Sequence, residues 1–98
     1  MILTTTNNIE GHKIVDYLGI VTGIDVNRSV TKSSFNHETI IKDIEQQVLK
    51  VKEDAFQKLA DNAKKLNANA VVGILVDIEM KDSMKVVISV TGTAVKVI

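Results

Sequence analysis

A chain of 98 residues has the length of one small domain, and we expect residues 1–98 to form a single one. Twelve basic and twelve acidic residues cancel, which argues against a nucleic-acid partner because such a protein needs a basic surface over the phosphates. The absence of cysteine excludes a disulfide framework and a thiolate metal site.

The N-terminal residues do not have the pattern of a secretory signal, because Met1-Ile2-Leu3 leads directly into three threonines. The longest apolar run, Ala70 to Val76, is far too short to span a bilayer. We therefore expect a cytoplasmic protein with no membrane partner.

The first long strand is expected from Lys13 to Ile24, after a very short strand near Ile2 to Thr5. Gly19 and Gly23 interrupt its apolar pattern, and glycine inside a strand indicates a bulge or the close approach of another backbone. Asp25 to Ser34 then forms a polar connection.

A long amphipathic helix is predicted from Asn36, a favourable N-cap, to Asn67, which tolerates the left-handed cap conformation. The pattern also allows a break near Glu45–Gln47. Apolar residues at steps of three and four form one stripe: Ile41, Ile44, Val48, Val51, Ala55, Leu59, Ala63 and Leu66. Acids precede lysines by four residues in three expected pairs: Glu38–Lys42, Asp54–Lys58 and Asp61–Lys65.

Two further strands, joined by the polar turn Lys81-Asp82-Ser83, are predicted to pair as an antiparallel hairpin. Alternation places Val72, Ile74, Val76, Ile78 and Met80 on one face of the first strand, and Val71, Leu75, Asp77 and Glu79 on the other. The second strand presents Met84, Val86, Ile88, Val90 and Ala94 on one side, and Val87, Ser89, Thr91, Thr93 and Val95 on the other. The expected fold is α+β: an antiparallel sheet, in the order β-β-α-β-β, with one long helix packed on one face.

One helix covers only one of the two apolar faces of this sheet. We expect it to cover Val72, Ile74, Val76, Ile78, Val86, Ile88 and Val90, and to leave Val71, Leu75, Val87, Val95 and Val97 facing outward. Full burial of one such side chain is worth roughly 1.5–3 kcal/mol, so four exposed ones forfeit an amount that rivals the whole stability of a small domain. Because exposed apolar patches mark interfaces, the second face is expected to be buried between copies of this chain. The residues predicted for that interface are Ile2, Leu3, Leu75, Val87, Ser89, Thr91 and Val95.

Five segments of the chain resemble the YbjQ-like family of small bacterial proteins. They are Ile2-Leu3-Thr4-Thr5-Thr6, Ile9-Glu10-Gly11, the run from Ile14 to Gly23, the run from Ala68 to Ile74, and Val90-Thr91-Gly92-Thr93-Ala94-Val95. The match extends in order from the first residues to the last. The resemblance implies a dodecin-like α+β subunit assembled as a ring, typically a homopentamer. That family carries the description "putative heavy-metal-binding", and its function is otherwise uncharacterised.

The sequence departs from this family at one place. Relatives usually carry a Gly-Gly-Arg-Ser-like segment, followed by a tyrosine, ahead of the main helix. Here Ile40–Ile44 passes directly into Glu45–Leu49, so that segment is shortened or absent near Ile44–Val48. Its polar residues therefore have no counterparts in this chain.

Candidate metal ligands are few. His12 and His37 have no ligand spacing around them, and a structural or solvated role is expected for each. Asp77 and Glu79 lie two residues apart on a strand, so their carboxylates point the same way and, repeated around a ring, would suit a hard cation. The favoured interpretation of this pair is a solvated strand end that discourages edge pairing.

Catalytic motifs are also lacking. Ser89, Thr91 and Thr93 share a face, but no histidine lies near them in sequence to activate a hydroxyl. Gly19 to Gly23 lacks the Lys-Ser/Thr of a phosphate loop. We therefore expect a non-enzymatic homo-oligomer for which the sequence indicates no cofactor. The alternative is a metal-ion or small-molecule binding module with its ligand at the subunit interfaces.

Overall fold

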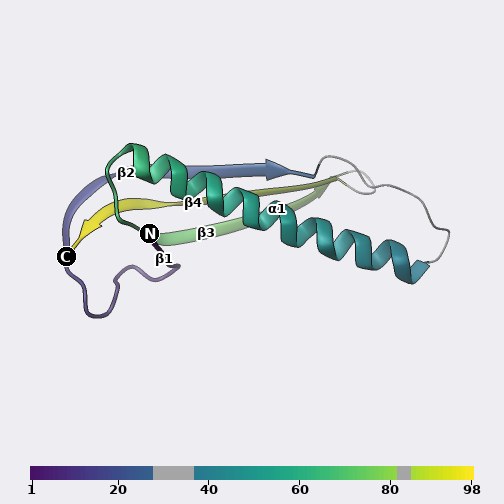
Figure 1. Ribbon diagram of the computed structural model, residues 1–98, viewed down its shortest axis with the longest axis horizontal. Helices are drawn as coiled ribbons and strands as arrows, with labels where there is room; N and C mark the ends of the chain where they lie inside the picture. Colours follow the sequence, from purple (N-terminus) through teal and green to yellow (C-terminus); the bar gives the residue numbers. More distant parts are fainter. Residues whose placement is uncertain (28–36, 82–84) are drawn as a thin grey trace.

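The computed structural model describes residues 1–27, 37–81 and 85–98. Its elements are β1 (Ile2–Leu3), β2 (Ile14–Val26), α1 (His37–Lys65), β3 (Ala70–Lys81) and β4 (Lys85–Val97). The strands form one sheet in the order β1-β3-β4-β2, and α1 crosses one face of it (Figure 1). The α+β class and the β-β-α-β-β order are confirmed, whereas the predicted cap at Asn36 lies outside the described residues.

The sheet is mixed rather than wholly antiparallel. β4 pairs antiparallel with both β2 and β3, as predicted, but β1 runs parallel to β3, with Ile2 opposite Ala70 and Leu3 opposite Val71. The N–H of Thr4 continues this edge by donating to the carbonyl of Val71 at 3.0 Å. The prediction of an antiparallel sheet was wrong at this edge because a two-residue strand carries no pattern that fixes its direction.

A bulge at Gly73 reverses the faces of β3. Gly73 has a φ of 62°, and Val72 lies opposite Thr93 while Leu75 lies opposite Thr91. Two residues of β3 therefore stand against one residue of β4, which shifts the alternation by one position. Glycine suits the bulge because a side chain disfavours positive φ.

The reversal explains an error in the predicted faces. Val71 belongs to the core beneath α1 together with Ile74, whereas Val72 packs on the opposite side of the sheet. The prediction had exchanged these two valines because strict alternation was carried through the bulge. Gly92 makes room for the side chains of Val71 and Ile74, since a Cβ there would lie 2.6 Å from Val71 Cγ1 and 2.9 Å from Ile74 Cγ1.

The main core lies between α1 and the two strands β2 and β4. The C-terminal half of the α1 stripe is buried at Val51, Ala55, Leu59 and Ala63, and it packs with Val86, Ile88, Val90 and Ala94 of β4. Ile41 and Leu49, nearer the start of α1, are exposed. The helix is continuous through residues 45–47, without the break that the pattern allowed.

Gly23 sets the distance between the helix and the sheet, and Asn67 sets the C-terminal end of the helix. A Cβ on Gly23 would overlap the carbonyl oxygen of Ala55 and lie 2.6 Å from the nitrogen of Leu59, so α1 sits directly on the β2 backbone. Asn67 has a φ of 65° and ends the helix, with its N–H donating to Lys64 and that of Ala68 to Ala63. Both the close approach and the asparagine cap were predicted.

A smaller apolar cluster lies on the opposite side of the sheet, near the chain termini. Ala70, Val72, Val95 and Val97 are buried there, with Ile9 and Ile14 packed against them. Val95 and Val97 were predicted to face outward uncovered, and this is wrong because the segment before β2 folds over them. Only the rest of that face is left open.

Candidate functional site

The open part of the sheet opposite α1 is apolar at its rim and hydroxyl-bearing at its centre. We call it the outer sheet face and define it by Ile20, Thr22, Ile24, Leu75, Ser89 and Thr91. Ile20, Ile24 and Leu75 are 78%, 54% and 76% exposed. Pairing of β2 with β4 sets Ile24 opposite Ser89 and Thr22 opposite Thr91, whose hydroxyl oxygens lie 3.1 Å apart.

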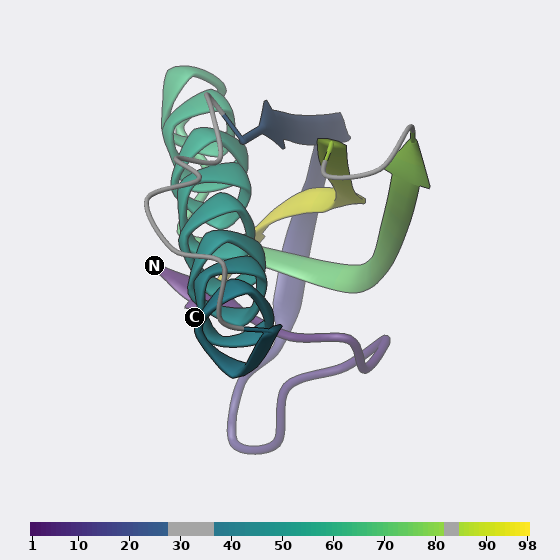
Figure 2. The ribbon, with the colours of Figure 1, turned by 90° about the vertical axis from the view of Figure 1, so that its right-hand side faces the viewer.

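A second open surface lies on the helix side, along the end of β3. We call Leu75–Lys81 the β3 arm. Its side chains Val76, Ile78 and Met80 point to the helix side and form the inner arm face, yet they are 42%, 48% and 60% exposed. The prediction that α1 covers Val76 and Ile78 is wrong because the helix lies over β2 and β4 (Figure 2).

The edge of the β3 arm is open as well. β1 pairs with β3 only at Ala70 and Val71, and bonds from the N-terminal segment reach no further than Ile74. Within the described residues, the arm therefore has β4 on one side and no strand on the other. An open edge with apolar side chains along one face is typical of a strand that docks on a partner.

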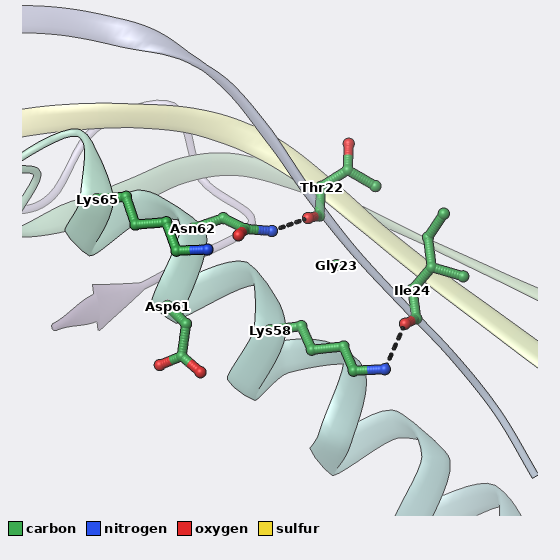
Figure 3. A pocket seen from close by; sticks show the side chains of 7 residues that line it. All are labelled: Thr22, Gly23, Ile24, Lys58, Asp61, Asn62 and Lys65. Atoms are coloured by element: carbon green, nitrogen blue, oxygen red, sulfur yellow. Dashed lines mark hydrogen bonds between the residues drawn. The ribbon is translucent and has the colours of Figure 1, made fainter.

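The opposite edge of the sheet is closed by the helix. Asn62 donates through Nδ2 to the carbonyl oxygen of Thr22 at 2.8 Å, and Lys58 donates through Nζ to that of Ile24 at 3.1 Å (Figure 3). These carbonyls belong to β2, the edge strand on that side. Their engagement leaves this stretch of β2 poorly suited to pair with another strand.

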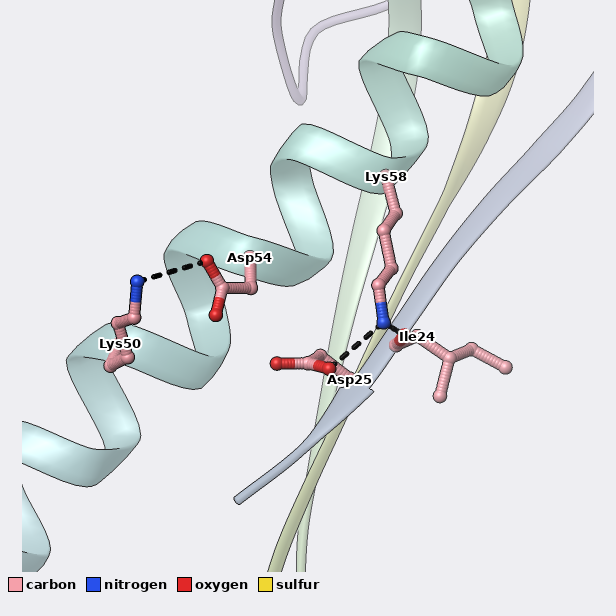
Figure 4. A network of polar contacts seen from close by, with 5 residues as sticks. All are labelled: Ile24, Asp25, Lys50, Asp54 and Lys58. Atoms are coloured by element: carbon pink, nitrogen blue, oxygen red, sulfur yellow. Dashed lines mark hydrogen bonds and ion pairs between the residues drawn. The ribbon is translucent and has the colours of Figure 1, made fainter. Parts of the chain in front are cut away.

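The Lys58 side chain points toward β2 because its ammonium group pairs with the carboxylate of Asp25. Lys58 Nζ lies 2.9 Å from Asp25 Oδ1, and Asp25 is only 5% exposed (Figure 4). The predicted Asp54–Lys58 pair is thus wrong, because the buried carboxylate on β2 takes the ammonium group, while Asp54 pairs with Lys50 at 3.4 Å. No local pattern predicts this contact, since Asp25 lies at the start of an expected polar connection.

A pocket of about 460 Å³ lies between α1 and the capped edge of β2, lined by Thr22, Gly23, Ile24, Lys58, Asp61, Asn62 and Lys65 (Figure 3). Its two central donors, Lys58 and Asn62, are already engaged with β2. Asp61 accepts a hydrogen bond from Gln57 at 3.0 Å rather than forming the predicted pair with Lys65. The polar side chains that line the pocket thus serve mainly to join α1 to β2.

The candidate metal residues lie at the exposed end of the arm. Asp77 and Glu79 are exposed on the outer side, and Glu79 lies 3.5 Å from the ammonium nitrogen of Lys81. No three His, Asp or Glu side chains gather as a possible metal site in the described part of the chain. His12 is exposed, while the side chain of His37 and residue Asp82 lie outside that part.

The residues predicted for a subunit interface have different surroundings within one chain. Leu75 is almost fully open, whereas Val87, Ser89, Thr91 and Leu3 are half-buried and Ile2 lies exposed at the β1 edge. Val95 is completely buried within the single chain, in the cluster against which Ile9 and Ile14 pack. Sequence reasoning did not include Ile20 and Ile24 in the interface, although their spacing with Thr22 places the three on one face of β2.

Comparison with known proteins places the chain in a family. A family model described as "Putative heavy-metal-binding" matches residues 1–98, and the chain belongs to this YbjQ-like family. The fold is similar to that of a protein of unknown function from Pediococcus pentosaceus ATCC 25745, which belongs to the DUF74 family. The two share 18% identity and a TM-score of 0.71, over 100% of this chain and 98% of the other.

The described part of the chain contains no helix long and apolar enough to cross a membrane. The cytoplasmic location expected from the sequence stays a prediction.

Proposed function

We propose that this protein functions as a non-enzymatic assembly of identical subunits, a ring of dodecin-like chains and specifically a homopentamer. The family resemblance supports the ring and its size. The amount of surface that one chain exposes supports the assembly independently.

The single chain has more surface than a compact monomer of its mass. Its accessible surface is 6575 Å² for 10.7 kDa, whereas the scaling for monomeric proteins gives about 5,500 Å². The surplus of roughly 1,000 Å² is close to the ~800 Å² that each partner buries in a standard interface. A chain of this shape is therefore well suited to association with its own copies.

The dimensions of the chain lead to the same conclusion. The radius of gyration is 16.3 Å, compared with about 12.6 Å expected for a compact domain of this length. The extents of 54 × 23 × 17 Å describe a thin, elongated body, in which one helix and one sheet cannot enclose a deep core. Neighbouring copies would supply the missing cover.

Sedimentation velocity of the purified protein at low micromolar concentration tests the proposal. We expect a single species larger than one chain of 10.7 kDa. A monodisperse monomer would refute the assembly, because it would show that the open apolar surfaces are stable in water.

A second candidate function is binding of a metal ion or small molecule between subunits. The family description favours it, and Asp77 and Glu79 offer two carboxylates on one side of a strand. Isothermal titration with a divalent cation should then give heat that Asp77→Asn abolishes. Asp16→Asn, which changes an exposed carboxylate on β2, should leave the titration unchanged. Equal heats from wild type and Asp77→Asn would exclude this site.

A further inference from the structure

The described part of the chain has two open apolar surfaces, and they lie on opposite sides of one sheet. The outer sheet face turns away from α1, with Ile20, Ile24 and Leu75 at its rim. The inner arm face, with Val76, Ile78 and Met80, turns toward the helix side. One flat contact with a second copy cannot cover both surfaces of the same chain.

We infer that copies associate head to tail, with the inner arm face of one chain packed on the outer sheet face of the next. This inference rests on the proposed assembly and specifies its contact. Every chain then uses both surfaces, one toward each neighbour. Such a heterologous contact generates a closed ring or a filament rather than an isolated dimer.

Contact between two inner arm faces is sterically unfavourable. α1 stands on the same side of the sheet as the inner arm face (Figure 2), so two such faces cannot approach flat without their helices meeting. Among residues 1–27, 37–81 and 85–98, no helix lies over the outer sheet face. It therefore fits beside α1 against the arm of a neighbouring copy.

Edge pairing between two β3 arms is unfavourable for a different reason. An antiparallel pair centred on Ile78 would place Asp77 of each chain directly opposite Glu79 of the other. Like charges in directly opposed positions destabilise a strand pair. The two carboxylates thus discourage the symmetric pairing that an open edge otherwise invites.

Contact between two outer sheet faces would leave the inner arm face open in every dimer. The head-to-tail contact covers both surfaces by a single kind of interface. It also brings apolar side chains of the arm to a face whose centre, Thr22, Ser89 and Thr91, is small and uncharged.

Complementation between two variants tests the inference. Ile78→Lys disables the inner arm face, and Ile20→Lys disables the outer sheet face; both side chains are exposed in the single chain, so the fold tolerates the change. We expect each variant alone to sediment as a monomer. An equimolar mixture should form a dimer of one chain of each kind and nothing larger, because only one intact arm and one intact face remain in the pair.

The other outcomes contradict the inference in distinguishable ways. If either variant alone remains dimeric, or the mixture stays monomeric while wild type assembles, the head-to-tail contact is wrong and the assembly stands. If the wild-type protein is itself monomeric, the proposed assembly of identical subunits is wrong as well. Ile98→Lys, at the exposed C-terminal residue, is the matched control and should assemble as wild type does. Should a variant lose its far-ultraviolet circular dichroism, Met80→Lys and Ile24→Lys replace the pair.

Discussion

At the scale of single residues, the helix backbone approaches the sheet closely at Gly23. The α1 backbone at Ala55 and Leu59 occupies the space that a Cβ at this position needs. Because the obstructing atoms belong to a helix backbone rather than to a flexible side chain, local adjustment cannot relieve the overlap.

Gly23→Ala should therefore destabilise the fold by about 1–3 kcal/mol or more, as overpacking does. Chemical denaturation at a fixed protein concentration measures the change, since assembly makes stability depend on concentration. Gly11→Ala is the comparison: Gly11 has open space around it and a φ of 82°, so it reports the backbone cost alone, roughly 1–2 kcal/mol. A Gly23→Ala protein as stable as wild type would contradict the close packing.

The ion pair between Lys58 and Asp25 is the other informative contact at this scale. Asp25 is buried, while the Lys58 side chain is about half exposed, which reduces the value of the pair. Lys58 also holds the carbonyl of Ile24, so its ammonium group joins α1 to the β2 edge at two points.

Replacing this lysine by methionine, Lys58→Met, keeps the aliphatic stem and removes the ammonium group. We expect a loss of about 1–2 kcal/mol of unfolding free energy, because a buried carboxylate and an edge carbonyl lose a charged donor. Lys50→Met removes the exposed pair with Asp54 and should cost less than about 0.5 kcal/mol. Equal effects of the two substitutions, measured by urea denaturation, would contradict the importance given to the buried pair.

At the scale of elements, the bulge at Gly73 determines which side chains β3 turns toward the helix. It sends Val71 and Ile74 into the core and Val72 to the opposite cluster. A slip of one position would exchange these sets, because side chains alternate along a strand.

The backbone at this position should thus resist an ordinary side chain. Gly73→Ala is expected to lose about 1–2 kcal/mol, the cost of left-handed φ for an L-residue. Gly73→Asn should lose less, because asparagine adopts that conformation more readily. Thermal unfolding of both variants checks the order; alanine being the better tolerated would argue against the bulge.

Sequence reasoning predicted the elements well because their signals are local. The stripe from Val48 to Ala63 and the Asn67 cap define α1, and alternation defines β4. Sequence reasoning failed where the structure depends on contacts between residues that are far apart in the sequence. The direction of β1 and the Lys58–Asp25 pair depend on partners that no local pattern encodes. The reversal at Gly73 had a local sign, a glycine inside a strand, which strict alternation ignored.

The candidate site was predicted only in outline for the same reason. An uncovered sheet face follows from counting one helix against two apolar faces. The extent of that uncovered face cannot be predicted in this way. It depends on the segment before β2, which covers Val95, and on α1, which lies over β4 instead of β3. The inner arm face is a consequence of that helix position.

At the scale of the whole molecule, the chain is a thin α+β body with open apolar surfaces on both sides of its sheet. The family to which it belongs carries the description "Putative heavy-metal-binding", whereas the open apolar surfaces of the chain favour association of identical chains. Mass measurement under native conditions addresses both features in one experiment.

Native mass spectrometry of protein purified without added metal or chelator is that measurement. We predict a closed assembly whose mass is a whole-number multiple of 10.7 kDa, five chains in the proposed ring, with no mass beyond the polypeptide. Additional mass in whole-number proportion to the subunits would favour the ligand-binding alternative. A monomer would contradict the central claim that the open sheet surfaces are buried between copies.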